Sequence, residues 1–197
     1  MSLHSQQYLG VTIKGDGRWN SHIEETVNKG NRTLGFVRRN LRVGSKTMKE
    51  LAYKALVRPC LEYAAAIWDP HDKKHIQNLE KIQRRAARFV CNDYHTTSSV
   101  SKMLEKLDWP SLEHRRQETR LVMLRKILDG DLKVNLEGIR PAPTRQRRGH
   151  NKQLEVPFCN KDLRQKAFLP RTIREWNGLS QKTIDAPTAA SFKAQLC

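Results

Sequence analysis

The segment Ile76–Val90 constrains the fold of this chain more than any other part of the sequence. Its apolar residues recur at steps of three and four, which places them on one side of a helix: Ile76, Leu79, Ile82, Ala86, Phe89 and Val90. Cations follow the same spacing on another side: Lys81, Arg84, Arg85 and Arg88. Because like charges at this spacing repel each other, the pattern indicates either a solvated helix face or a surface that binds a polyanion.

The charge of the whole chain favours the polyanion. Lysine and arginine number 37 against 20 acidic residues in a chain of 197, which gives a formal net charge of +17. A surplus of this size predicts nucleic acid as the partner, with an anionic membrane surface as the weaker alternative.

The sequence predicts an intracellular protein without a membrane segment. No apolar run approaches the roughly 20 residues that a transmembrane helix needs, and the first residues lack the basic and apolar regions of a secretory signal. The cysteines are scattered without a C-x-x-C pair, which fits a reducing compartment: Cys60, Cys91, Cys159 and Cys197. We therefore expect a nuclear or cytoplasmic location and no membrane partner.

A short strand and a long helix are predicted at the start of the chain. Tyr8–Ile13 is rich in β-branched and aromatic residues and precedes the turn Lys14–Gly17, so we expect it to form one strand of a hairpin. An S-x-x-E capping box at Ser21–Glu24 then opens a helix whose apolar stripe continues to Leu41. Gly30 and Gly35 would be weak points of that helix, because a residue without a side chain loses more conformational freedom when a helix forms.

The segment Lys46–Trp68 is the most apolar of the chain and follows a possible capping residue, Ser45. Pro59 lacks an N–H group and predicts a kink in this helix, which Asp69-Pro70 would end. Asp72 can cap the central helix that follows. We expect the three long helices to form an antiparallel core.

Shorter helices are predicted toward the C-terminus. Their expected first-turn or capping residues are Ser98 or Ser99, Ser111, Pro170 and Thr188, and the helix after Ser111 would run to Leu128. Periodicity disappears between Asp131 and Glu155, where Arg145, Arg147 and Arg148 would lie in a flexible basic loop. That loop would be either a solvated linker or an arm that contacts phosphates.

The predicted fold class is therefore mainly α. A short N-terminal β-hairpin would occupy residues 1–19 and a basic helical bundle residues 20–130. The flexible basic loop would follow at 131–157, and a loosely packed helical C-terminal tail at 158–197.

The sequence contains no pattern that predicts catalysis. It has no G-x-S-x-G, Walker A or G-x-G-x-x-G motif, and its acidic residues are interleaved with cations rather than paired. Two i, i+4 pairs could in principle supply zinc ligands, namely His71 with His75 and Cys91 with His95. Because one pair lies at a helix start and the other in a turn-rich segment, we expect neither a metal nor another cofactor.

Aromatic side chains offer a second route to nucleic acid, because bases stack on them. Most of them lie on apolar stripes or beside helix breaks, where core packing is the expected role, as at Trp68, Trp109 and Trp176. Trp19 and Tyr94 lie in polar surroundings and are the better candidates for stacking.

Several segments, taken in order, resemble a known family. They are YLGV (8–11), TLGFVRRNL (33–41), YKALVRPCLEYAAAIWDP (53–70), LEKIQRRAARFV (79–90), SSVSKMLEKLDW (98–109) and FLPRTIREWNGL (168–179). Together they resemble the C-terminal part of reverse transcriptases from non-LTR retrotransposons, most of all the jockey-like and CR1-like lineages. The similarity covers the chain from about Tyr8 to Phe192.

The resemblance implies the primer-grip, thumb and post-thumb regions of an RNA-directed DNA polymerase. The primer-grip-like residues would be Tyr8, Leu9, Gly10 and Val11. The aromatic-x-Asp-Asp signature of the family's palm should precede YLGV and is absent from this sequence. Without the carboxylates that hold two metal ions, we expect a truncated copy that does not polymerise by itself.

The leading hypothesis is a fragment that binds the backbone of a template–primer or of RNA through basic helices. The residues expected to bind nucleic acid are Arg38, Arg39, Arg42, Lys81, Arg84, Arg85, Arg88, Arg145, Arg147 and Arg148. One alternative is an interaction module that docks on an acidic protein or on the polymerase body. Another is a remnant without function.

Overall fold

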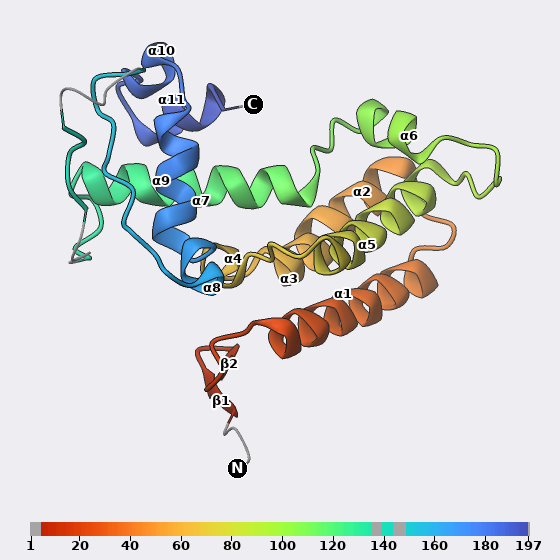
Figure 1. Ribbon diagram of the computed structural model, residues 1–197. Helices are drawn as coiled ribbons and strands as arrows, with labels where there is room; N and C mark the ends of the chain where they lie inside the picture. The colour runs from red at the N-terminus through yellow and green to blue at the C-terminus, as the bar shows by residue number, and fades with distance from the viewer. Residues whose placement is uncertain (1–4, 135–138, 144–148, 197) are drawn as a thin grey trace. The chain divides into compact units, whose positions relative to one another are not determined.

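The computed structural model describes residues 5–134, 139–143 and 149–196. The chain divides into two compact units, Met1–Arg115 (unit 1) and Arg116–Cys197 (unit 2). A two-stranded antiparallel hairpin is followed by helices, which confirms the mainly α fold class (Figure 1).

The hairpin consists of β1 (Ser5–Tyr8) and β2 (Val11–Lys14), with Tyr8 opposite Val11. Its turn is formed by Leu9 and Gly10, whose φ angles of 46° and 78° are those of a type I′ turn. The expectation of a single strand over Tyr8–Ile13 is therefore wrong. A leucine rarely adopts positive φ, so the sequence carries no ordinary turn signal at this position.

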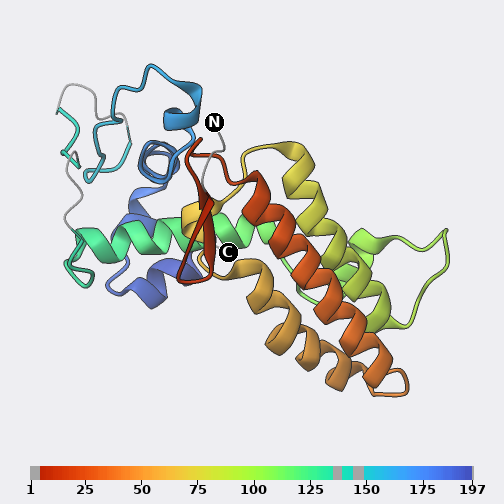
Figure 2. The ribbon, with the colours of Figure 1, turned by 90° about the horizontal axis from the view of Figure 1, so that it is seen from below.

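Unit 1 is built around three helical segments that pack side by side and alternate in direction (Figures 1 and 2). In chain order its helices are α1 (Asn20–Asn40), α2 (Lys46–Ala52), the π-helical η1 (Tyr53–Val57), α3 (Arg58–Glu62), α4 (Ala65–Trp68), α5 (Lys73–Cys91) and α6 (Val100–Lys106). The segment from α2 to α3 is antiparallel to both α1 and α5, as expected. Its core includes Trp68, Leu79 and Ile82, none of them more than 1% exposed.

The segment Lys46–Trp68 is not one kinked helix. The chain widens into η1 just before Pro59, and a second break follows at Ala64, whose φ is 52°. A π-turn accommodates the missing N–H group and the bulk of a proline ring without ending the helix. At the second break, the Trp68 indole N–H donates to the Tyr63 carbonyl at 2.8 Å.

Most of the predicted helix caps are confirmed. At the starts of five helices a side-chain oxygen of the predicted capping residue accepts a hydrogen bond from a backbone N–H group. These residues are Ser45 before α2, Asp72 before α5, Ser99 before α6, Ser111 before α7 (Leu112–Leu128) and Thr188 before α11 (Ala189–Ala194). The capping box at Ser21–Glu24 is wrong, because α1 already begins at Asn20 and the Ile23 amide bonds to the Trp19 carbonyl at 2.9 Å.

This earlier start of α1 places His22 in the core, where it is 5% exposed. The Thr12 amide of β2 donates to His22 Nδ1 at 3.2 Å, and the His22 ring meets the Trp68 ring edge-on at 5.4 Å. Burial lowers the pKa of His22, with an opposing effect from Glu25. His22 therefore links the hairpin to the helical core as a neutral imidazole.

Unit 2 has a hydrophobic core of its own. Its helices are the second part of α7 (Leu112–Leu128), then α8 (Asp162–Gln165), α9 (Phe168–Asn177), α10 (Gln181–Ile184) and α11 (Ala189–Ala194). Leu124 of α7 packs in one cluster with Ile173, Trp176 and Phe192, each at most 1% exposed. The C-terminal residues are thus well packed rather than loosely packed, and the division falls at 115/116 rather than at residue 130 because α7 contributes to this core.

The described parts of the expected flexible loop are held in place. Pro141 pairs with Leu154 in an isolated antiparallel bridge. Asn177 bonds to both backbone groups of Leu154, at 2.9 and 2.7 Å, and His150, 1% exposed, lies 2.9 Å from the Trp176 carbonyl. Residues 149–154 are therefore part of the unit 2 fold and not a solvated linker.

Gly30 is a packing site and not a weak point of α1. A Cβ atom at Gly30 would lie 2.5 Å from Leu61 Cδ2 and 3.1 Å from Ile82 Cδ1, so the missing side chain lets α1 approach α3 and α5 closely. At Gly35 the nearest atom would be the outer end of Arg39, at 3.5 Å.

We expect Gly30→Ala to lower the free energy of unfolding by about 1–2 kcal/mol, because overpacking outweighs the better helix propensity of alanine. The matched control Gly35→Ala should raise it by up to about 1 kcal/mol. Urea denaturation followed by circular dichroism measures both. Equal stabilisation by the two substitutions would contradict the close approach of α1 to Leu61.

Because the pKa of His22 is lowered in the folded chain, we expect the protein to become less stable as the pH decreases. The unfolded chain takes up a proton near pH 6.5, whereas the folded chain does so only at lower pH. The free energy of unfolding should therefore decrease as the pH falls below about 6.5. In His22→Asn, where an amide oxygen can still accept the Thr12 N–H, this decrease should become smaller. An unchanged pH profile would refute the burial of a neutral His22.

Candidate nucleic-acid interface

Three of the cations predicted on the central helix lie at the surface of α5. Lys81, Arg84 and Arg85 are exposed, and none of them forms an ion pair with a described residue. Arg85 donates to Asn31 Oδ1 of α1 at 3.1 Å, and Lys81 donates to Asn78 Oδ1 at 3.4 Å. These charges are thus accessible to an external anion.

Arg88 does not share the environment of these three cations, although the sequence spacing placed it on the same face of the helix. Its guanidinium donates to the backbone carbonyls of Asp93, His95 and Ser98, at 3.4, 2.8 and 3.3 Å. Hydrogen bonds from Ser98 and from the His95 amide also lower the pKa of Asp93. Arg88 therefore orders the loop that follows α5, and with it the neighbouring Tyr94.

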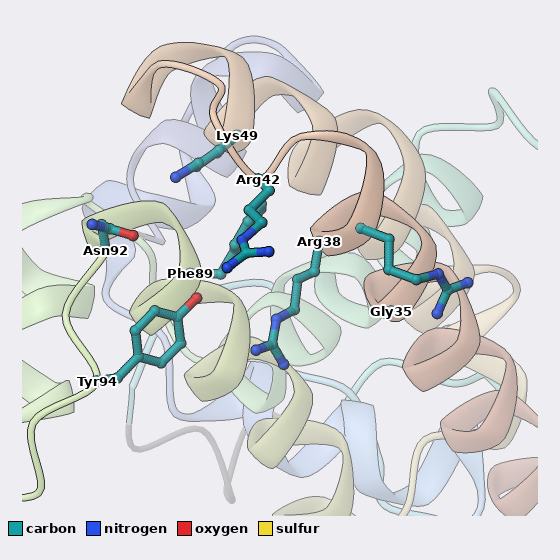
Figure 3. Close-up of a pocket in the computed structure, with 8 residues that line it drawn as sticks. Gly35, Arg38, Arg42, Lys49, Phe89, Asn92 and Tyr94 are labelled. Carbon is teal, nitrogen blue, oxygen red and sulfur yellow. The ribbon is translucent and has the colours of Figure 1, made fainter.

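The cations predicted near the end of α1 are exposed and gather around a pocket of about 600 Å³. The pocket is lined by Gly35, Arg38, Arg39, Arg42, Lys49, Phe89, Asn92 and Tyr94 (Figure 3). The pocket is bordered by the C-terminal ends of α1 and α5, by α2 and by the loop that follows α5. No acidic residue is among these lining residues.

The direction of the helices explains this gathering of charge. Asn31 of α1 contacts Arg85 of α5, and further along both helices residues 35–42 and 89–94 line the same pocket, so α1 and α5 run in the same direction. Their C-terminal ends therefore meet. Cations offset the negative end of a helix dipole, which accounts for part of the charge found there.

The pocket combines cations with aromatic rings. The Arg38 guanidinium lies 5.7 Å from the centre of the Tyr94 ring, and Lys49 Nζ lies 5.0 Å from the centre of the Phe89 ring. Arg42 and Lys49 point into the space that Phe89, Asn92 and Tyr94 border (Figure 3). The burial of Lys49 could not be predicted from the sequence, because a lysine on an amphipathic helix carries no sign of being buried.

Tyr94 is accessible to a base, as the prediction that it stacks on nucleic acid requires. It is 52% exposed at the edge of the pocket, whereas Trp19 packs against the core of unit 1. Trp68, Trp109 and Trp176 are buried, as expected for core residues.

The primer-grip-like residues form the tip of the hairpin. Tyr8 and Leu9 are 65% and 73% exposed, Gly10 completes the turn, and Val11 is buried. The Tyr63 hydroxyl donates to the Leu9 carbonyl at 2.8 Å, which supports the tip against the end of α3.

Several arginines of α7 have structural roles in unit 2. Arg120 is 1% exposed and donates to both carboxylate oxygens of Glu175 at 2.7 Å. Arg125 donates to the carbonyls of Ile184 and Ala186 at 2.8 and 3.1 Å and pairs with Asp129 at 2.6 Å. The predicted loop cations Arg145, Arg147 and Arg148 lie outside the described residues.

In the part of the chain that the structure describes, no group of three or more His, Cys, Asp or Glu side chains is placed to hold a metal ion. His75 Nδ1 instead lies 3.1 Å from an Asp72 oxygen. Within the same residues, every helix is too short or too polar to cross a bilayer.

Comparisons with protein-family models, curated proteins and solved structures found no match to this chain.

Proposed function

We propose that this chain binds the phosphate backbone of nucleic acid, as the thumb-like C-terminal part of a non-LTR retrotransposon reverse transcriptase. The observation that carries the proposal is the set of accessible cations of unit 1 without acidic partners. They are Arg38, Arg39 and Arg42 near the end of α1, and Lys81, Arg84 and Arg85 on α5.

Backbone binding follows from the chemistry of these side chains. Each arginine or lysine can neutralise one phosphate and release the counterion bound there. Five of the six side chains belong to two helices that pack against each other, and Arg42 lies in the turn just after α1, so their backbone positions are fixed before binding. Such contacts recognise the shape and charge of a duplex or of RNA and not its base sequence.

The sequence resemblance supports the polymerase part of the proposal. In that reading the hairpin tip, with Tyr8 and Leu9 exposed, corresponds to the primer grip, and the helices of unit 1 correspond to the thumb. This sequence has no aromatic-x-Asp-Asp motif, so we expect no polymerisation by this chain alone. An upstream polymerase portion would be its natural partner.

A second candidate function, docking on an acidic protein or on the polymerase body, is favoured by exposed apolar side chains near the cations. Val43, Met48 and Leu51 are 97%, 53% and 66% exposed, next to or on α2. A protein partner could cover these residues and contact the cations together.

The direct test is a fluorescence-anisotropy titration with an RNA–DNA hybrid, a DNA duplex and single strands over a range of salt concentrations. If about six phosphates are neutralised, log K should fall with log salt at a slope of about −5 for a duplex. An affinity that does not depend on salt would contradict backbone binding and favour docking or a remnant without function.

Charge variants locate the interface. The double variant Arg84→Gln/Arg85→Gln should weaken binding to every nucleic acid and reduce the steepness of the slope by about 2. The matched control Lys161→Gln/Lys182→Gln removes the same charge from exposed positions of unit 2 and should leave the slope nearly unchanged. Equal effects of the two variants would mean that net charge, and not this surface, determines binding.

A further inference from the structure

Most of the Lys49 side chain is buried, and its ammonium group lies at the pocket without an acidic partner among the described residues. Its side chain belongs to a residue that is 5% exposed, and the face of the Phe89 ring is the contact that its ammonium group makes among the described residues. A lysine with so little exposed surface normally has an anionic partner. The position of Lys49 at the pocket therefore suggests that an anion from outside the chain completes its surroundings.

A helix dipole does not explain Lys49. The helix α2 continues directly into η1 with helical angles at Tyr53, so no free helix end lies beside it. The ends of α1 and α5 do face the pocket, and each contributes about −0.5 of a charge. Together they offset about one of the four cations that line it: Arg38, Arg39, Arg42 and Lys49. The pocket thus remains strongly positive.

The charge of the pocket indicates which phosphate it would take. An internal phosphodiester carries one negative charge, whereas a phosphate monoester carries about −1.5 to −2 at pH 7 and offers three oxygens. Several cations that converge on one hollow suit the monoester better than a diester. A volume of about 600 Å³ falls within the usual range for small-ligand sites.

The Tyr94 ring supplies a place for a base beside the phosphate. It is half exposed, and the Arg88 hydrogen bonds to the loop around it fix its position before a ligand arrives. A base stacked on an aromatic ring contributes about 1–3 kcal/mol regardless of its identity.

We propose that this pocket binds the terminal phosphate monoester of a nucleic-acid strand, held by Lys49, Arg42 and Arg38, with the adjoining base on Tyr94. This inference rests on the nucleic-acid binding proposed above and gives it a second component, which recognises a strand end.

The test compares short single strands of one sequence that carry a 5′-phosphate, a 3′-phosphate or only hydroxyl ends. Anisotropy should show that one phosphorylated strand binds about tenfold tighter or more than the hydroxyl-ended strand, as expected for a charge-assisted contact. In Lys49→Met, which keeps the length of the side chain over Phe89, this preference should vanish while the affinity for the hydroxyl-ended strand remains.

Two further variants control for folding. Lys46→Met removes an exposed charge of the same helix outside the pocket lining and should keep the preference. Arg42→Gln changes an exposed pocket residue and should lose the preference even if Lys49→Met fails to fold. Thermal unfolding of each variant verifies its fold.

Each other outcome overturns the inference in a distinct way. Equal binding of all three strands would leave the proposed backbone binding intact and refute the end-phosphate site. A preference that survives both Lys49→Met and Arg42→Gln would place the phosphate elsewhere. Adenosine monophosphate binding as tightly as the phosphorylated strand would make a free nucleotide the ligand. Binding of no strand at all would refute the proposed function together with this inference.

Discussion

The close approach of α1 to α3 and α5 at Gly30 is the contact on which the rest of unit 1 depends. A side chain there would overlap Leu61, a residue with no exposed surface. α1 can therefore lie directly on its neighbours. The antiparallel segment between α1 and α5 makes these two helices run in the same direction, so their basic ends meet. The pocket with Lys49 is a consequence of that packing. Gly30 would weaken α1 if that helix stood alone, but in the folded unit it allows the packing that brings these charges together.

The arginines of this chain fall into two groups that net charge cannot distinguish. Arg88, Arg120 and Arg125 donate to carbonyl or carboxylate oxygens within their own unit and stabilise its fold. Arg84 and Arg85 remain accessible. A formal charge of +17 therefore overstates what is available to a polyanion. Exposed cations also occur elsewhere, as at Lys161 and Lys182, and what supports nucleic-acid binding is the group that lies together on α1, in the turn after it and on α5.

Features set by a few neighbouring residues could be predicted from the sequence. The apolar stripe of α5 and the caps at Ser45 and Asp72 depend on helical spacing and local hydrogen bonds alone. The Leu9-Gly10 turn and the burial of Lys49 depend on contacts with distant segments, made by Tyr63 and Phe89. Of the candidate site, the cations of α1 and α5 and the exposed Tyr94 were therefore predicted, whereas the structural role of Arg88 and the pocket itself were not.

The central claim is that nucleic acid meets this one surface of unit 1. Backbone amide chemical shifts of the labelled chain, measured by NMR during titration with an RNA–DNA hybrid, test it most directly. We expect the largest changes in residues 35–42, around Lys49 and in residues 81–94, with small changes in unit 2. Changes spread evenly over both units, or concentrated in residues 116–197, would contradict it.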